Sequence, residues 1–172
     1  MAKNPCPNLD LFEGSYPGTL NGEGSAFFIM GNERRPESMA RLVGLHTLLW
    51  ENSTIEDVEE ELSRFLKAHS VGKEEIDLFI LGRNGSSTYD YLYRQFEDLV
   101  PDSAPIAYYK HLCGEYMTST SFALWVAANV LHSQSLPEVL TFRKGSRSNF
   151  QKVLIYNQSQ AKEHAFILLE RI

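Results

Sequence analysis

The side chains best suited to chemistry lie close together in the second half of the chain. Lys110, His111, Cys113 and Glu115 stand within one short stretch, and Asp90 precedes them near an expected helix start. Glu115 would act as a general base if burial raised its pKa, and a cysteine near a histidine forms a nucleophilic dyad when a third group orients the histidine. Each residue also has a structural interpretation: Lys110 pairs with Glu115 or Asp90, Cys113 is a small half-buried residue beside an unrelated histidine, and Asp90 is favoured by the helix dipole. We expect the structural interpretation at each position.

A glycine- and serine-rich turn from Gly82 to Ser87 joins an expected strand to an expected helix. Such a junction can bind phosphate through backbone N–H groups. This turn has neither the lysine of a P-loop nor the GxGxxG pattern of a dinucleotide site. We therefore interpret it as a plain connection.

Alternating strands and helices are expected to position these residues. Apolar residues recur at helical spacing over 55–66 and 89–99. Ser53 and Thr54 both offer an N-cap for the first helix, and Ser53 with Glu56 fits the capping-box spacing. Apolar runs of strand length occupy 25–30, 42–50, 76–81, 105–109, 153–156 and 165–170. The order predicts an α/β fold, with a mainly parallel mixed sheet, helices packed on it and a C-terminal antiparallel strand pair.

Two segments are too apolar for an exposed position. The run 25–30 is apolar on both faces, which is typical of a strand inside a covered sheet. The expected helix 118–132 is apolar all round, which predicts that it is buried on every side. Either the fold wraps tightly around this helix, or another chain covers one side of it.

Composition limits the functions that remain. Apolar residues make up 43% of the 172 residues, charged residues 22%, and the net charge is −6, which argues against nucleic acid as a partner. No signal peptide or membrane span is expected, and Cys6 and Cys113 lack zinc-site spacing, so we expect a reduced, cytoplasmic protein without metal or cofactor.

The first residues, 1–20, are rich in proline and glycine and predict an arm or loop, followed by a single domain over 21–172.

Four segments, in order, resemble the C-terminal half of the β-ketoacyl-[acyl-carrier-protein] synthases, a thiolase-like family of acyltransferases. Gly22-Glu23-Gly24-Ser25-Ala26 resembles the family's GEGAA segment, and 76–86 is similar to its strand ending in HGTGT, with Asp90 at the position of a helix-start aspartate. Lys110 and Gly114 match the segment K-S-x-x-G-H, and 153–170 resembles the final hairpin. The resemblance covers about residue 22 to the C-terminus.

The departures from the family pattern fall on its catalytic positions. Gly82 replaces the histidine of HGTGT, and Glu115 replaces the histidine of the GH motif. In the family these histidines stabilise the thioester oxyanion and assist decarboxylation. Neither glycine nor an ionised glutamate can donate a hydrogen bond to an oxyanion. The family's nucleophilic cysteine belongs to its N-terminal half, so we expect no condensation by this chain alone, and assign it no confident catalytic or substrate-binding residue.

The resemblance implies an inactive accessory or chain-length-factor-like subunit in fatty-acid, polyketide or polyene lipid synthesis. Its partner would be a separately encoded half, an active ketosynthase or a second copy. An acidic acyl carrier protein could use the basic loop Arg143, Lys144 and Arg147, although a solvated loop is the simpler interpretation. Two alternatives stay open. One is altered chemistry on acyl thioesters by Glu115 with Lys110 or His111, and the other is a free-standing binding module.

Overall fold

A six-stranded sheet forms the centre of the computed structural model, which describes residues 9–12 and 17–172. The strands lie in the order β1-β6-β5-β2-β3-β4. The parallel pairings join β2 to β3 and to β5, and the antiparallel pairings lie towards the edges of the sheet. This confirms the α/β mixed sheet and its C-terminal antiparallel pair. The sheet is not mainly parallel as predicted, because three of its five strand pairings are antiparallel. The strands are β1 Arg41–Leu49, β2 Leu78–Leu81, β3 Ile106–Tyr108, β4 Thr141–Arg143, β5 Lys152–Ser159 and β6 Glu163–Glu170.

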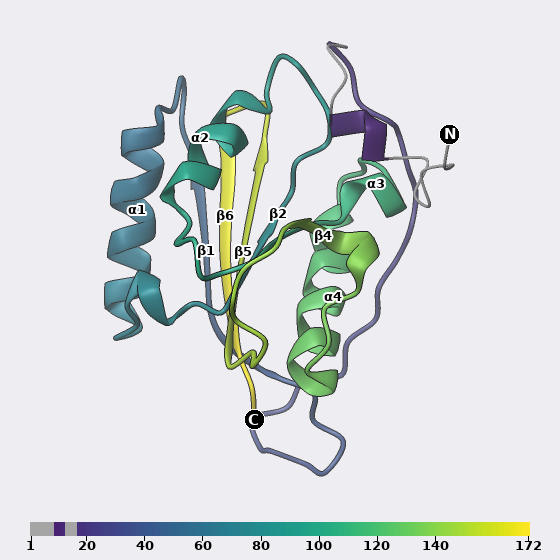
Figure 1. Cartoon of the computed structure of the whole chain (residues 1–172), viewed down its shortest axis with the longest axis vertical. Helices are drawn as coiled ribbons and strands as arrows, with labels where there is room; N and C mark the ends of the chain where they lie inside the picture. Colours follow the sequence, from purple (N-terminus) through teal and green to yellow (C-terminus); the bar gives the residue numbers. More distant parts are fainter. Residues whose placement is uncertain (1–8, 13–16) are drawn as a thin grey trace.

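Helices cover both faces of this sheet (Figure 1). On one face lie α1 (Ile55–Ala68) and α2 (Tyr91–Leu99), and on the other lies α4 (Ser119–Ser133) with the short α3 (Lys110–Cys113) at one end. Each face has its own cluster of buried apolar side chains. Single 3-10 turns occur at Leu9–Phe12, Lys73–Glu75 and Glu138–Leu140.

The start of α1 differs in detail from the sequence prediction. Thr54, not Ser53, is the N-cap, and it exchanges hydrogen bonds with Asp57 rather than with Glu56. The Ser53 hydroxyl is buried and used elsewhere. The apolar stripe that the spacing predicted does face the sheet, through Val58, Leu62, Phe65 and Leu66.

The described chain does not bury helix α4 on every side, so the alternative in which the fold wraps tightly around it was wrong, and cover by another chain stays a prediction. Its sheet-facing side is buried, but Trp125 is 48% exposed, and Phe122 and Leu124 are half-buried. The segment 17–40 passes along the outer side of α4 (Figure 1). It covers the helix in part and leaves an apolar surface.

The predicted strand 25–30 was also wrong. The segment has no strand assignment, and Phe27 and Ile29 are 91% and 99% exposed. The physical reason is that α4 separates this segment from the sheet, so no strand edge lies beside it. The isolated bridge of this part of the described chain lies before the run, between Asn21 and Glu115.

Part of the predicted N-terminal arm packs onto the domain. Phe12 is buried, and its ring lies 4.7 Å from that of Tyr108. Residues 1–8 and 13–16 lie outside the described residues, so the prediction is not examined there.

The basic loop is not simply solvated. Arg143 donates hydrogen bonds to the carbonyls of Glu97 and Val100, and Arg147 forms a 2.6 Å ion pair with Asp77. Two of its three cationic side chains therefore bind neighbouring segments of the chain, and Lys144 is the one that stays exposed.

Within the described ranges, none of the helices combines the length and the apolar character that a membrane crossing requires.

Candidate functional site

The carboxyl ends of three neighbouring strands bring the predicted site residues together. Gly82 follows β2, Lys110 lies just after β3, and Asn157 stands near the end of β5. Because β2 is parallel to β3 and to β5, these ends meet at one edge of the sheet, where open α/β sheets place their ligands.

A buried ion pair lies at this edge. Lys110 is 1% exposed, and its Nζ atom lies 2.6 Å from Oε2 of Glu115. The same carboxylate accepts hydrogen bonds from Nδ2 of Asn84 at 2.7 Å and from Oγ of Ser119 at 3.2 Å. Of the two pairings expected for Lys110, the structure therefore has the one with Glu115.

This arrangement limits what the pair can do. Burial lowers the pKa of Lys110, and the neighbouring Glu115 opposes that shift. The Glu115 carboxylate already accepts three hydrogen bonds from the chain, which leaves it poorly placed to take a proton from a substrate.

No space remains for a side chain at Gly82. A Cβ atom there would lie 2.7 Å from the hydroxyl of Tyr93 and would overlap Oδ1 of Asn157. These two groups are fixed by hydrogen bonds, because Tyr93 and Tyr109 both donate to Oδ1 of Asn157, at 3.1 and 3.3 Å. Burial raises the pKa of both tyrosines, so they remain neutral donors.

The turn after Gly82 is held by Asp90. This carboxylate accepts hydrogen bonds from the backbone N–H groups of Asn84 and Gly85 and from Nε of Arg83. Burial raises the pKa of Asp90, and these three donors oppose the shift. The backbone N–H groups of Asn84 and Gly85 therefore donate to the carboxylate of Asp90 and are not available to bind the phosphate of a ligand.

Sequence reasoning missed Arg83. It is 6% exposed and binds Asp90, Glu97, the Tyr108 hydroxyl and the carbonyl of Phe12. The only signal in the sequence was a charged residue one position beyond the glycine that ends a run of apolar residues. Arg83 thus links four segments by hydrogen bonds: the glycine turn, α2, β3 and the N-terminal turn. These contacts hold the segments that surround the site in place.

His111 and Cys113 do not form a dyad. Nε2 of His111 contacts the Val139 carbonyl at 2.7 Å, whereas Sγ of Cys113 points to the Gly114 carbonyl at 3.3 Å. Both residues lie in the short helix α3, where residues two apart face different directions. Burial also raises the pKa of Cys113, which disfavours the reactive thiolate.

Two glycines bring the segment 20–24 onto the site. A Cβ on Gly114, whose φ is +73°, would lie 2.6 Å from the Cα of Gly22. The backbones also exchange hydrogen bonds, from Gly22 to Glu115 and from Glu115 to Leu20. The Gly22 and Gly114 positions of the family resemblance therefore touch each other.

A second polar cluster lies elsewhere, beside the turn that joins β5 to β6. Tyr156 donates to Nδ1 of His164 at 3.1 Å, and Nε2 of His164 lies 2.7 Å from Oγ of Ser53. The Ser53 hydroxyl donates to the carbonyl of Ala161 at 2.5 Å, so His164 must donate to Ser53 rather than take its proton. The cluster is a hydrogen-bonded chain that ties β6 to the start of α1, and its serine is not an activated nucleophile.

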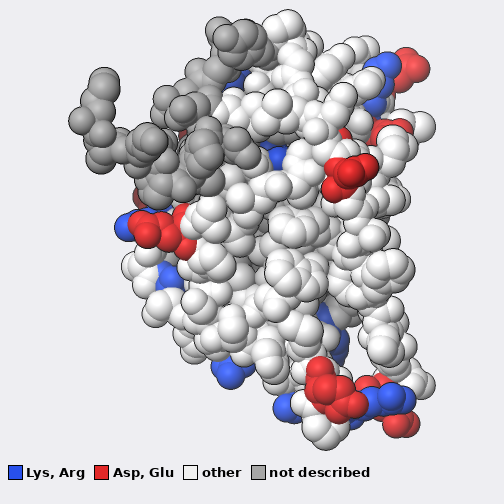
Figure 2. Space-filling view, turned by 90° about the vertical axis from the view of Figure 1, so that its right-hand side faces the viewer, with Lys and Arg blue, Asp and Glu red and all other residues white. Residues whose placement is uncertain are grey.

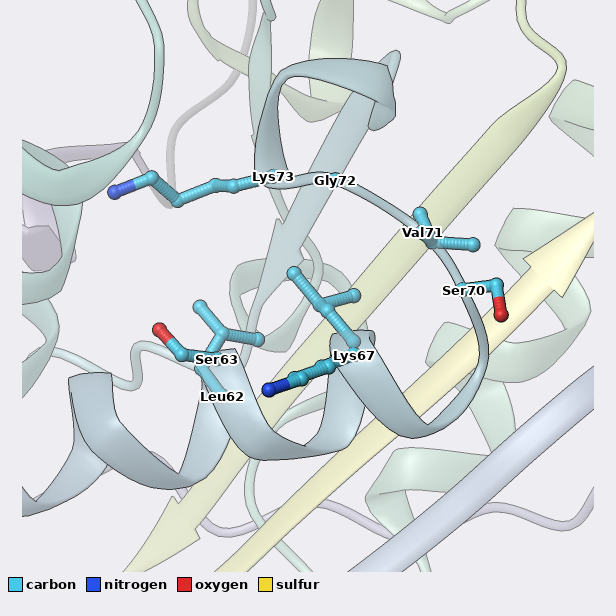
Figure 3. A pocket seen from close by; sticks show the side chains of 8 residues that line it. Leu62, Ser63, Lys67, Ser70, Val71, Gly72 and Lys73 are labelled. Atoms are coloured by element: carbon cyan, nitrogen blue, oxygen red, sulfur yellow. The ribbon is translucent and has the colours of Figure 1, made fainter.

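A hollow on the described surface lies apart from these residues. It has a volume of about 500 Å³ and opens at the end of α1, where Lys67 and Lys73 lie at its rim (Figure 3). Another hollow is lined by residues 50–53 and by Asp57, Glu60 and Glu61. Among the described residues, His, Cys, Asp and Glu side chains form no group able to hold a metal ion.

No family model and no curated protein matches the sequence. Solved structures do match the fold. The ishigamide ketosynthase/chain length factor has a TM-score of 0.63 at 13% identity, over 78% of this chain and 38% of that one. A type II polyketide ketosynthase in complex with its acyl carrier protein has a TM-score of 0.58 at 12% identity, over 78% and 39%.

A β-ketoacyl synthase from Burkholderia phymatum STM815 has a TM-score of 0.58 at 12% identity, over 78% of this chain and 38% of that one. The chain thus has the thiolase-like fold of the ketosynthases, as the sequence resemblance implied. It spans less than two fifths of the length of each of these structures.

Proposed function

We propose that this chain is a non-catalytic ketosynthase-like subunit. The observation that carries the proposal is the filling of both histidine positions. The position of Gly82 is closed by Asn157 and Tyr93, and the Glu115 position holds a carboxylate that pairs with buried Lys110. A ketosynthase needs hydrogen-bond donors aimed at a developing oxyanion, and neither position supplies one.

A large uncharged surface supports the role of a subunit. The face that carries α4 and the segment 17–40 has few charged side chains except near its margins (Figure 2). Phe27, Ile29 and Met117 are almost fully exposed, and Trp125 is half exposed. Large exposed apolar side chains on a face with few charges are typical of a protein interface.

The partner that best fits is a ketosynthase-like chain. Solved structures with this fold include a ketosynthase/chain length factor, and another holds an acyl carrier protein. We place residues 21–172 as one thiolase-like domain that pairs with such a chain in fatty-acid, polyketide or polyene lipid synthesis. The basic loop contributes little to acyl carrier protein binding in this proposal, because Arg143 and Arg147 are already engaged.

The test has two parts. The purified chain is incubated with acyl- and malonyl-carrier protein, and mass spectrometry follows decarboxylation and condensation, neither of which we expect. The tagged chain is then isolated from its native cells. A ketosynthase-like chain in equal amount supports the proposal, whereas turnover by the isolated chain contradicts it.

A further inference from the structure

The outer edge of β1 is an open sheet edge. β1 is the terminal strand of the sheet, and it pairs only with β6. In the described part of the chain, no backbone hydrogen bond joins residues 41–49 to any segment outside that ladder. The opposite edge strand, β4, has only 3 residues, whereas β1 has 9.

The register identifies the backbone groups that face outward. Trp50 donates its N–H group to the carbonyl of Lys162, which continues the pairing of Leu49 with Glu163. Since hydrogen-bonded positions alternate along an antiparallel pair, 48, 46 and 44 also face β6. The N–H and C=O groups of Leu45, Thr47 and Leu49 therefore point away from the sheet.

The usual protections of an edge strand are weak here. Natural edges carry lysine, proline, inward-pointing charge or a bulge. β1 has a bulge between Leu42 and Gly44, but from Gly44 to Leu49 it has no proline and no Lys, Arg, Asp or Glu. Leu45 and Leu49 are 60% and 76% exposed.

The opposite charges at the two ends of β1 favour antiparallel pairing with a second copy of this chain. Arg41 opens the strand and Glu51 follows it. Both are exposed, although Arg41 also forms an ion pair with Glu170 of β6 at 2.5 Å. If two copies pair antiparallel with His46 opposite His46, Arg41 of each copy lies near Glu51 of the other. Leu45 then exchanges hydrogen bonds with Thr47 of the second copy, at positions where both strands present outward groups.

We propose that two copies of this chain associate through residues 44–49 of β1, about a two-fold axis that joins their sheets into one. Such an interface is closed, so it ends at a dimer. It lies on the sheet edge rather than on the α4 face, and it does not depend on the proposed pairing with a ketosynthase.

Analytical ultracentrifugation and amide exchange test this proposal. We expect a dimer, with exchange of the Leu45, Thr47 and Leu49 amides slowing at least tenfold from dilute to concentrated protein. Thr47→Pro removes one outward N–H group and no bond to β6, and should give a monomer. Thr47→Val keeps that group and should remain dimeric.

A wild-type monomer at all concentrations, or a dimer that Thr47→Pro leaves intact, would overturn the proposal. If Thr47→Pro does not fold, the concentration dependence of amide exchange in the wild type decides alone. Loss of dimerisation with retained ketosynthase binding would separate this interface from the proposed function.

Discussion

Oδ1 of Asn157 occupies the space that a Cβ atom on Gly82 would need, although 75 residues separate the two. The two residues are therefore packed tightly against each other. A side chain at position 82 would fit only if Asn157 and Tyr93 moved.

Gly82→Ala should lower the free energy of unfolding by about 1–3 kcal/mol, because the added methyl group overpacks the space held by Asn157 and Tyr93. Urea denaturation measures the change. Gly31→Ala is the matched control, since the nearest atom to its Cβ would lie at 3.9 Å. Equal stability of the two variants would mean that the position is open.

Glu115→Gln should destabilise the protein by about 3–5 kcal/mol, because it leaves the buried ammonium of Lys110 without its counter-charge. Lys110→Met should cost less, since Glu115 is partly exposed and keeps Asn84 and Ser119 as donors. The double variant should be more stable than the sum of the single effects predicts, as a double-mutant cycle would measure. Additive effects would contradict a coupled pair.

Ser53→Ala should cost about 1–3 kcal/mol, because His164 and the Ala161 carbonyl lose their shared partner in a buried place. Ser135→Ala, at an exposed position, serves as the control and should change stability by less than about 0.5 kcal/mol. A neutral Ser53→Ala would show that the hydrogen-bonded chain contributes nothing to stability.

Stability should fall as the pH drops through about 6.5. Burial lowers the pKa of His164 below its usual 6.5, so the unfolded chain takes up a proton there before the folded chain does. Buried His111 acts in the same direction. His164→Gln should flatten the dependence of unfolding free energy on pH between about 7 and 5, and an unchanged slope would exclude His164 as its source.

Phe27→Ser with Ile29→Ser should abolish binding of a ketosynthase-like partner and leave thermal stability within about 0.5 kcal/mol, because both side chains are almost fully exposed. Tyr91→Ser, on α2 across the sheet, is the control and should retain binding. Partner capture by the double variant at the wild-type level would move the interface away from this face.

Local patterns in the sequence were enough to predict most of the elements. Apolar spacing predicted α1 and β1 closely, since each buries one face against a neighbour in the same chain. The same reasoning was wrong for 25–30, whose composition suits a covered strand although nothing in the described chain covers it. The sequence shows that the run is apolar, but it does not show whether another element packs on it, and in the described chain none does.

The site was predictable in part. The sequence predicted an ion pair of Lys110 with either Glu115 or Asp90, and the structure has the pair with Glu115, the nearer of the two in sequence. The filling of the Gly82 position by Asn157 was not predictable, because it depends on how β2 and β5 lie side by side. The role of Arg83 was missed for a similar reason, since its partners come from four separate segments.

Native mass spectrometry of the tagged chain isolated from its own cells tests the central claim most directly. The account predicts a complex that contains this chain and a ketosynthase-like chain in equal numbers, and its loss in the Phe27→Ser, Ile29→Ser variant. A chain recovered alone or only with its own copies, together with condensation activity in the isolated protein, would contradict the account.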